Sequence, residues 1–312
     1  MKINNCNLCG SENFELLYKT KDRMFNLDGV FDLKKCSNCS LVFLDPQPGQ
    51  AELKKYYPSK KYYAYNKTEK KGFLAKLREY PVRHYYSPSV LSFIITKFIK
   101  SVPAIPSYKK NGKILDLGCG TGETLQLLKK IGWKTYGMDI DENALSAAKK
   151  SGLNNLSLGG YRDLEKYPDN YFDSIRLYHV IEHIDNPSLA INFIKRKLKK
   201  NGEVIMGTPD INSIVAKLFK SYWYNLDSPR HLYLFSTLTL KKLMEKEGLK
   251  VEKIRSESGW GIAGSLQYFI NEKFNKKLDL FNNIFVFLAL YPLEWLLDKL
   301  QLGDIFIVTA RK

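Results

Sequence analysis

The sequence has few arginines. Nine arginines stand beside forty lysines in 312 residues, and the formal net charge is +17. Arginine is the residue suited to bidentate recognition of phosphates and bases, and the lysines are scattered. The charge therefore indicates a basic surface more than a dedicated nucleic-acid site. No charged segment followed by an apolar one opens the printed sequence, so we expect a cytoplasmic protein.

Long apolar runs are also lacking. The longest weakly charged stretch, residues 280–297, is at the lower limit for a membrane-spanning helix, and Pro292 interrupts it. We expect a buried or interfacial helix there. Residues 88–100 have apolar side chains at helical spacing next to a basic segment. These two stretches predict peripheral contact with the inner face of a membrane, and burial in a homodimer is the alternative.

Cysteine is scarce, but four of the five cysteines are paired in the sequence. Two C-x-x-C pairs are separated by 26 residues, and each pair can place two thiolates on one turn. In a reducing compartment this pattern predicts a tetrahedral zinc site rather than disulfides, with a structural role because four protein ligands leave no open position. The F-E-L-L-Y segment and Val30–Leu33 are expected to be short strands of a ribbon. The predicted zinc ligands are Cys6, Cys9, Cys36 and Cys39.

Glycine is concentrated where a buried strand is expected to end. The stretch Lys113–Gly122 reads K-I-L-D-L-G-C-G-T-G, and Glu123–Ile131 has a helical pattern. A strand, a glycine turn and a helix start are the layout by which a nucleotide-like cofactor meets a sheet, since glycine permits close approach and positive φ. Asp139 ends the next expected strand, 19 residues after Gly120. Its carboxylate can accept hydrogen bonds from ribose hydroxyls; the alternative is that it caps the helix starting near Glu142.

These motifs resemble those of class I S-adenosylmethionine (SAM)-dependent methyltransferases, from Lys113 to Lys312. The resemblance implies an α/β fold with a doubly wound, mostly parallel sheet of seven strands in the order 3-2-1-4-5-7-6. The later strands are expected at Ser174–Tyr178, Asn201–Pro209, Leu249–Ser256 and Asp304–Ala310. The cofactor-binding residues it implies are Asp116, Gly118, Cys119, Gly120, Gly122, Asp139, Ile140, Asp163 and Tyr178.

The expected domain organisation has three parts: a zinc ribbon over 1–48, a tyrosine- and lysine-rich linker with helices over 49–110, and the SAM-binding domain over 111–312. Insertions that face the acceptor or a membrane are expected at about 211–245 and 262–302. The ribbon, the D-P-Q-P segment, the paired tyrosines and P-R-H-L-Y-L-F-S together resemble a bacterial branch often associated with surface-glycan or modified-sugar assembly. That resemblance implies a saccharide-type or lipid-linked small-molecule acceptor.

Candidate catalytic residues follow the fourth expected strand. Methyl transfer requires alignment of donor and acceptor, and an oxygen or nitrogen acceptor can also require a base. His179 and His183 are four residues apart, so in a helical register they share a face with Glu182 adjacent. Nothing nearby in the sequence completes a metal-ligand set. Glu182 and His183 are therefore candidates for catalysis, or for orienting the loop around the cofactor.

A second polar cluster, residues 223–235, follows the fifth expected strand. Within it Asp227, Arg230 and His231 stand among apolar residues. His231 is the preferred general base. Arg230 is a candidate for binding an acceptor phosphate or carboxylate, and a buried pair with Asp227 that stabilises the loop is the alternative.

Two other functions remain open. An RNA methyltransferase acting on ribose or a ring nitrogen is one, although the loop after the fourth strand is Y-H-V-I-E-H rather than N-P-P-Y-like. Methylation of a base carbon needs a cysteine nucleophile, and only Cys119, in the glycine loop, is available. The other is a non-enzymatic SAM-fold binding protein, against which the intact glycine loop and Asp139 argue.

Overall fold

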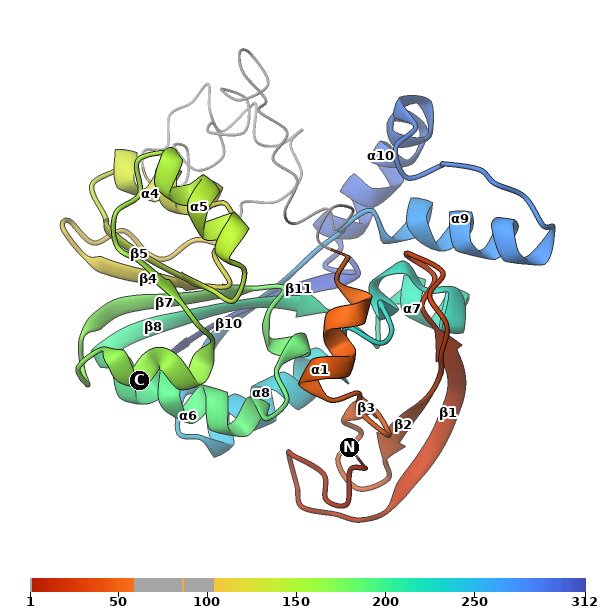
Figure 1. The fold of residues 1–312 in the computed structure, drawn as a ribbon, viewed down its shortest axis with the longest axis horizontal. Helices are drawn as coiled ribbons and strands as arrows, with labels where there is room; N and C mark the ends of the chain where they lie inside the picture. The colour runs from red at the N-terminus through yellow and green to blue at the C-terminus, as the bar shows by residue number, and fades with distance from the viewer. Residues whose placement is uncertain (1, 59–85, 87–103) are drawn as a thin grey trace.

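The computed structural model describes residues 2–58, 86 and 104–312 (Figure 1). Most of the predicted linker, including its tyrosine-rich segment, and the apolar stretch 88–100 lie outside the described residues. The described chain forms two sheets. The larger has seven strands in the order β10-β11-β8-β7-β4-β5-β6. This is the predicted order, read from the opposite edge.

Parallel pairing joins the five strands from β6 to β8, and the last two strands of the chain are antiparallel additions at the β8 edge. The central strands are buried along their length, as expected for parallel strands covered on both faces. The strands are β4 (Lys113–Leu117), β5 (Lys134–Asp139), β6 (Leu156–Leu158), β7 (Phe172–Tyr178), β8 (Leu198–Pro209), β10 (Lys250–Glu257) and β11 (Ile305–Arg311).

Helices cover both faces of this sheet. Figure 1 shows α4 (Glu123–Lys130) and α5 (Glu142–Lys150) on one face, and α6 (Pro187–Lys197) and α8 (Thr237–Lys246) on the other. Two of these helices begin at an N-cap residue: the side chains of Asn186 and Ser236 accept hydrogen bonds from backbone N–H groups in the first turns of α6 and α8, respectively. Short 3₁₀ turns, η3 (Tyr161–Lys166) and η4 (Ile181–His183), follow β6 and β7.

The smaller sheet contains the predicted ribbon strands, β1 (Phe14–Lys21), β2 (Val30–Cys36) and β3 (Val42–Leu44). Its fourth strand comes from far along the chain: β9 (Tyr233–Leu234) pairs antiparallel with β3. Buried residues of the N-terminal segment, such as Phe43, share a hydrophobic core with residues of α8 and β8. The N-terminal segment is therefore packed into the larger unit. Short turns α1 (Gln50–Leu53) and η1 (Lys54–Tyr56) follow it.

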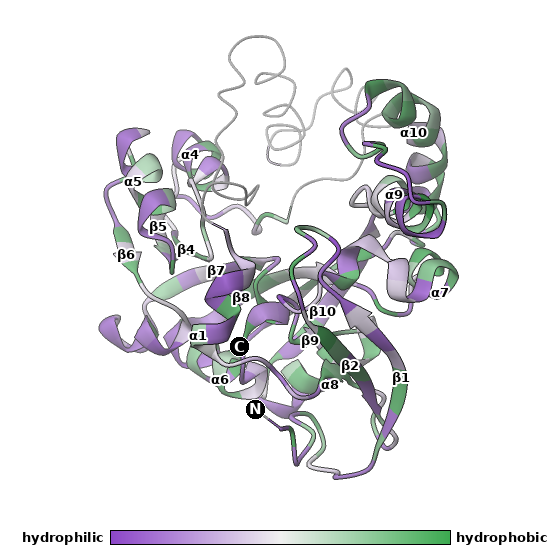
Figure 2. Ribbon diagram, turned by 45° about the vertical axis from the view of Figure 1, so that its right-hand side comes forward, coloured by the Kyte–Doolittle hydropathy of each residue, from purple (hydrophilic) through white to green (hydrophobic). Residues whose placement is uncertain are grey.

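The remaining elements are α7 (Ile214–Phe219), η5 (Lys220–Tyr222), η6 (Tyr224–Leu226), α9 (Gly261–Lys273) and α10 (Ile284–Lys299). The predicted apolar helix is α10, and Pro292 lies inside it. Figure 2 shows its hydrophobic residues on an element that stands away from the sheet. Phe285 is 77% exposed and Leu288 59%, whereas Glu294 is buried. Within the described residues, no helix is long and apolar enough to cross a membrane.

Candidate functional site

The glycine loop connects β4 to α4. Gly118, Gly120 and Gly122 all have positive φ, between 52° and 77°. A Cβ on Gly118 would lie 2.3 Å from Val180 Cγ2, so this residue allows the loop after β7 to approach the loop after β4. A Cβ on Gly120 would meet no described atom within 4 Å. The backbone at Gly120 is thus open to a ligand.

Asp139, at the end of β5, connects this loop to its neighbours. Its Oδ2 accepts from Gly120 N (2.7 Å) and its Oδ1 from Asp141 N (2.9 Å). Burial raises the pKa of Asp139, and backbone N–H groups oppose that shift. The helix cap of α5 is Asp141, whose Oδ1 accepts from Ala144 N. The alternative in which Asp139 caps that helix is therefore wrong, and its remaining lone pairs are available to a ribose.

Asp116 lies beneath the loop rather than on it. Its side chain is buried, and both of its oxygens accept hydrogen bonds from Arg176 Nη1 of β7, at 2.8 and 3.0 Å. Arg176 Nε also donates to Ala104 O (2.7 Å). The pair ties β4 to β7 under the predicted cofactor position. Direct contact between Asp116 and the cofactor stays a prediction.

The other predicted cofactor residues lie in the loops at the carboxyl ends of the same parallel strands. Ile140 is 74% exposed directly after Asp139. Gly159 N donates to Asp139 O, and Asp163 accepts from Gly160 N (2.9 Å), so the loop after β6 is tied to that after β5. Burial raises the pKa of the Cys119 thiol, which disfavours a nucleophilic thiolate.

Tyr178 ends β7, and its hydroxyl donates to Glu257 of β10. Burial raises its pKa strongly, and the nearby Glu257 carboxylate raises it further. The hydroxyl is thus engaged by Glu257 and not directed at the glycine loop's ligand as a proton donor, and its predicted contact with the cofactor stays untested.

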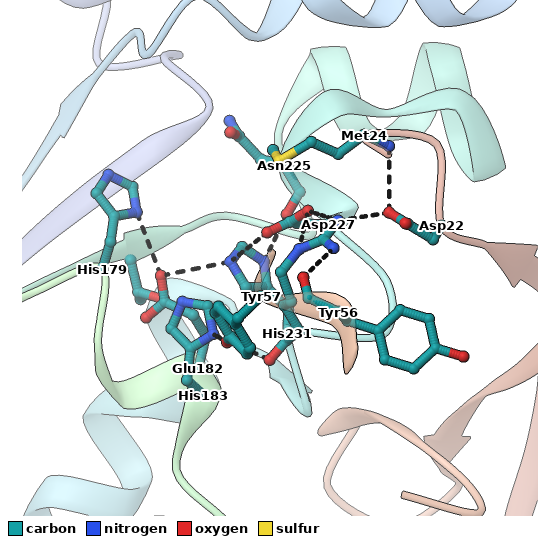
Figure 3. A network of polar contacts seen from close by, with 12 residues as sticks. Asp22, Met24, Tyr56, Tyr57, His179, Glu182, His183, Asn225, Asp227 and His231 are labelled. Atoms are coloured by element: carbon teal, nitrogen blue, oxygen red, sulfur yellow. Dashed lines mark hydrogen bonds and ion pairs between the residues drawn. The ribbon is translucent and has the colours of Figure 1, made fainter. Parts of the chain in front are cut away.

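Next to the glycine loop, Glu182 is the centre of a polar cluster (Figure 3). Its side chain is completely buried. Its Oε2 accepts from Thr208 Oγ1 (3.0 Å), and its Oε1 lies 3.2 Å from His179 Nδ1 and 4.0 Å from His231 Nε2. The His183 and His231 rings meet edge to face, with their centroids 4.6 Å apart. The structure therefore brings the three predicted catalytic residues together.

The helical register predicted for the segment after β7 is wrong. His179 has φ +55°, and only the single 3₁₀ turn η4 follows it. The chain turns sharply here because Val180 packs against Gly118. His179 and His183 consequently approach Glu182 from different sides rather than along one helix face.

Burial and the neighbouring charges set the protonation of this cluster. Burial lowers the pKa of His231 to about 4, and the nearby His183 adds to this effect. Burial opposes ionisation of Glu182, but the bond to His179 and the surrounding histidines outweigh it and lower its pKa to about 2. At neutral pH the cluster thus holds an ionised carboxylate beside a neutral His231.

Arg230 forms the predicted buried pair rather than an exposed anion site. It is fully buried and donates to Asp227 Oδ1 (2.9 and 2.6 Å) and Asp22 Oδ1 (2.7 Å). It also donates to Tyr56 O (2.9 Å). Asp22 and Tyr56 come from the N-terminal segment, so this network fastens that segment to the loop carrying His231.

Several residues of the cluster were not predicted. Tyr57 OH lies 3.0 Å from His183 Nδ1, and Thr208 and Asn225 contact Glu182 and His231. Thr208 has a signal in retrospect, because it stands at the carboxyl end of β8, the edge at which the other loops meet. Tyr57 belongs to the paired tyrosines that open the tyrosine-rich linker, but the sequence does not single it out from the other tyrosines there.

The four paired cysteines lie together at the N-terminal end of the small sheet. Their sulfur atoms are all within 4.8 Å of one another. The shortest separations are 3.4 Å between Cys6 and Cys39 and 3.6 Å between Cys9 and Cys36, with no disulfide. Four thiolates at a Zn–S distance of about 2.3 Å around one ion would be roughly 3.8 Å apart. The cluster therefore fits a tetrahedral metal ion.

Comparison with known families settles the class. The model of a methyltransferase domain matches residues 90–254. The chain belongs to this methyltransferase family. Its sheet order, its glycine loop and the acid after β5 agree with a SAM-dependent enzyme of class I.

Curated relatives of this methyltransferase are distant. An uncharacterized protein of Methanocaldococcus jannaschii is 28% identical over 52% of this chain and 83% of its own length. The ubiquinone biosynthesis O-methyltransferase of Hydrogenovibrio crunogenus is 28% identical over 40% of this chain, and the match spans 50% of that enzyme. Among solved structures, a SAM-dependent methyltransferase from Archaeoglobus fulgidus is similar with 22% identity and a TM-score of 0.46, covering 74% of this chain and 98% of its own.

Proposed function

We propose that this methyltransferase transfers the methyl group of SAM to a hydroxyl of a saccharide-type or lipid-linked small molecule. The observation that carries the proposal is the cluster of Glu182, His183 and His231 beside the glycine loop. A buried, ionised carboxylate beside the neutral imidazole of His231 is equipped to orient and deprotonate a hydroxyl. Methyl transfer to oxygen also agrees with the O-methyltransferases among the relatives.

The saccharide-type acceptor rests on the resemblance of the P-R-H-L-Y-L-F-S segment, which the structure places at the cluster through His231. A lipid-linked form is supported by α9 and α10, which expose Phe269, Ile284, Phe285 and Leu288. Such a surface suits contact with lipid headgroups and acyl chains. We therefore propose a peripheral position at the inner face of a membrane.

The acceptor is tested by methyl transfer from labelled SAM into an extract of source cells lacking this gene. Label in sugar-nucleotide, glycan or lipid fractions would support the proposal. Label in RNA would instead favour a nucleic-acid methyltransferase, and absence of label with SAM still bound would favour a SAM-fold binding protein.

His231→Ala should reduce turnover at least tenfold while SAM affinity stays unchanged; full activity would remove His231 from catalysis.

We further propose that Cys6, Cys9, Cys36 and Cys39 bind a structural zinc ion, with no position left for substrate. The ion would join the segment before β1 to the turn between β2 and β3. Purified protein should contain one zinc ion in this site, and Cys36→Ser should release it and lower the melting temperature. Cys119→Ser, which removes the fifth thiol, is the control and should retain the zinc. Retention of zinc by Cys36→Ser would refute the site.

A further inference from the structure

Three of the chain's four histidines gather around one carboxylate. Glu182, His183 and His231 each offer a ligand atom within 4.8 Å of the other two, and His179 Nδ1 lies 3.2 Å from Glu182 Oε1. Glu182 and His183 come from η4, and His231 comes from the segment before β9, 49 residues after Glu182. The fold thus completes a ligand set that is incomplete along the sequence.

Backbone carbonyls determine which ring nitrogen is free. His183 Nδ1 lies 2.9 Å from Arg230 O, and His231 Nδ1 lies 2.9 Å from Asn225 O. A carbonyl only accepts, so Nδ1 carries a hydrogen in each ring, and Nε2 is the ring nitrogen that remains for another partner; the Tyr57 hydroxyl, 3.0 Å from His183 Nδ1, lies on the same side of that ring as the carbonyl. Histidines that bind metals are commonly oriented by such a bond from the other ring nitrogen.

His231 Nε2 faces two carboxylates without hydrogen-bonding to either. It is 4.0 Å from Glu182 Oε1 and 3.9 Å from Asp227 Oδ2, beyond hydrogen-bond distance. Two carboxylate oxygens directed at one ring nitrogen in a buried site require a positive charge between them, which a bound cation would supply. Two ligand atoms that are each about 2.1 Å from one cation lie roughly 3 to 4 Å apart, which matches the Glu182 separation.

We propose that Glu182, His183 and His231 bind one divalent transition-metal cation, whose open coordination position takes the acceptor hydroxyl. Two imidazoles and one carboxylate are a donor set used by catalytic first-row metals, and three protein ligands leave room for substrate. Thr208 Oγ1 donates to the second oxygen of Glu182 and holds the carboxylate in place. Binding of the cation stands independently of the proposed function; its contact with the acceptor rests on that function.

The chemical step balances without another reactant. With the cation bound, Glu182 and His231 act on the acceptor through the cation instead of taking its proton directly. The cation lowers the pKa of the bound hydroxyl, whose proton passes to water. The acceptor oxygen then forms a bond to the methyl carbon as the bond from that carbon to the SAM sulfur breaks. The electron pair of the broken bond stays on sulfur, which converts the sulfonium to a neutral thioether. The step therefore requires an acceptor with a hydroxyl, as the proposed saccharide-type acceptor has.

The probe is Mn²⁺ added to the full chain as purified, followed by the loss of the free Mn²⁺ paramagnetic-resonance signal. Mn²⁺ prefers oxygen and nitrogen ligands, so the thiolate cluster competes poorly for it. We expect one bound Mn²⁺ per wild-type chain and at least tenfold weaker binding by Glu182→Gln and His231→Gln. Glu203→Gln is the matched control. Glu203 of β8 is also buried, but its carboxylate accepts hydrogen bonds from Ser107, away from the cluster.

Absence of Mn²⁺ binding to the wild type would overturn the inference, as would wild-type affinity in Glu182→Gln or an equal loss in Glu203→Gln. A second measurement needs no variant: bound Mn²⁺ should broaden the ring-proton resonances of His183 and His231 in the native protein. Unbroadened resonances would also refute the site. Methyl transfer from labelled SAM into the extract, measured with the same protein samples, distinguishes the outcomes. Failure of the proposed function would leave the sugar and lipid fractions unlabelled whatever happens to Mn²⁺, whereas failure of this inference would leave Mn²⁺ unbound.

Discussion

The site has a cofactor half and the polar cluster around Glu182, proposed above as its acceptor half, and the two halves are built in different ways. The cofactor half comes from consecutive strand–loop units, with Gly120 and Asp139 joined by a 2.7 Å hydrogen bond across neighbouring strands. The acceptor half is assembled from distant segments: Tyr57, Glu182, Thr208 and His231 meet from four parts of the chain. Local motifs suffice for the first half, whereas the second depends on tertiary packing.

Packing of the acceptor half depends on Arg230 more than on any single catalytic candidate. Its guanidinium joins Asp22 in the N-terminal segment to Asp227 in the loop before β9, and all three side chains are buried. Strand β9 then completes the small sheet beside β3. The N-terminal segment thereby shapes the acceptor half and lies apart from the glycine loop.

The largest expected effect follows from Arg230→Met. It leaves two buried carboxylates without their partner, so the free energy of unfolding should fall by about 3–5 kcal/mol. The measurement is urea denaturation followed by circular dichroism. Arg196→Met is the control, because Arg196 pairs with Glu165 and Asp169 on the exposed surface and should change stability far less. Equal losses in the two variants would show that the network does not fasten the acceptor half.

A smaller effect, confined to the cofactor half, is expected from Asp139→Ala. Losing hydrogen bonds to a charged acceptor should weaken SAM binding about 10- to 100-fold. Calorimetric titration with SAM measures this change. Asp141→Ala is the matched control: it removes the cap of α5, which costs about 1 kcal/mol of stability, and should leave SAM affinity nearly unchanged. Unchanged affinity in Asp139→Ala would reject its predicted role.

The same contrast explains what could be predicted from the sequence. The sheet order was predicted from the resemblance to class I methyltransferases, and that resemblance rests on local signals at a fixed separation, the Gly118–Gly122 loop and the acid at Asp139. The cysteine cluster was also predicted, since two C-x-x-C pairs are each local. The register after β7 was mispredicted, because the contact of Val180 with Gly118 overrides the helical spacing of the two histidines.

Long-range pairing was beyond the reach of sequence patterns. Nothing in a two-residue strand such as β9 indicates that it joins β3, about 190 residues earlier. The contact of Tyr57 with His183 and that of Asp22 with Arg230, next to His231, accompany that pairing. The identity of His231 as a candidate was predicted, but its proximity to Glu182 was not, because proximity here is a property of the assembled sheet edge.

The smallest expected effect is at the amino ends of the strands, away from the site. A substitution there should change the free energy of unfolding and leave both halves of the site unaffected. Asp173, at the start of β7, accepts from Lys113 N, Lys109 and Lys199. Burial opposes its ionisation, but these bonds outweigh it and lower its pKa to about 2. A carboxyl whose pKa is lower in the folded state stabilises the fold at pH values above its unfolded-state pKa. This stabilisation is lost as the pH falls toward 2.

Asp173→Asn should therefore lower the free energy of unfolding by about 1–2 kcal/mol at pH 7, a value reduced because both lysines are partly exposed. The difference from wild type should shrink to about half by pH 3, since the wild-type carboxylate is then losing its advantage over the unfolded chain. Denaturant titrations at several pH values measure this difference. SAM affinity should be the same in both proteins, because Asp173 lies at the amino end of a strand whose carboxyl end carries the site. A difference that stays constant with pH would mean that the lysine contacts do not set the pKa of this carboxyl.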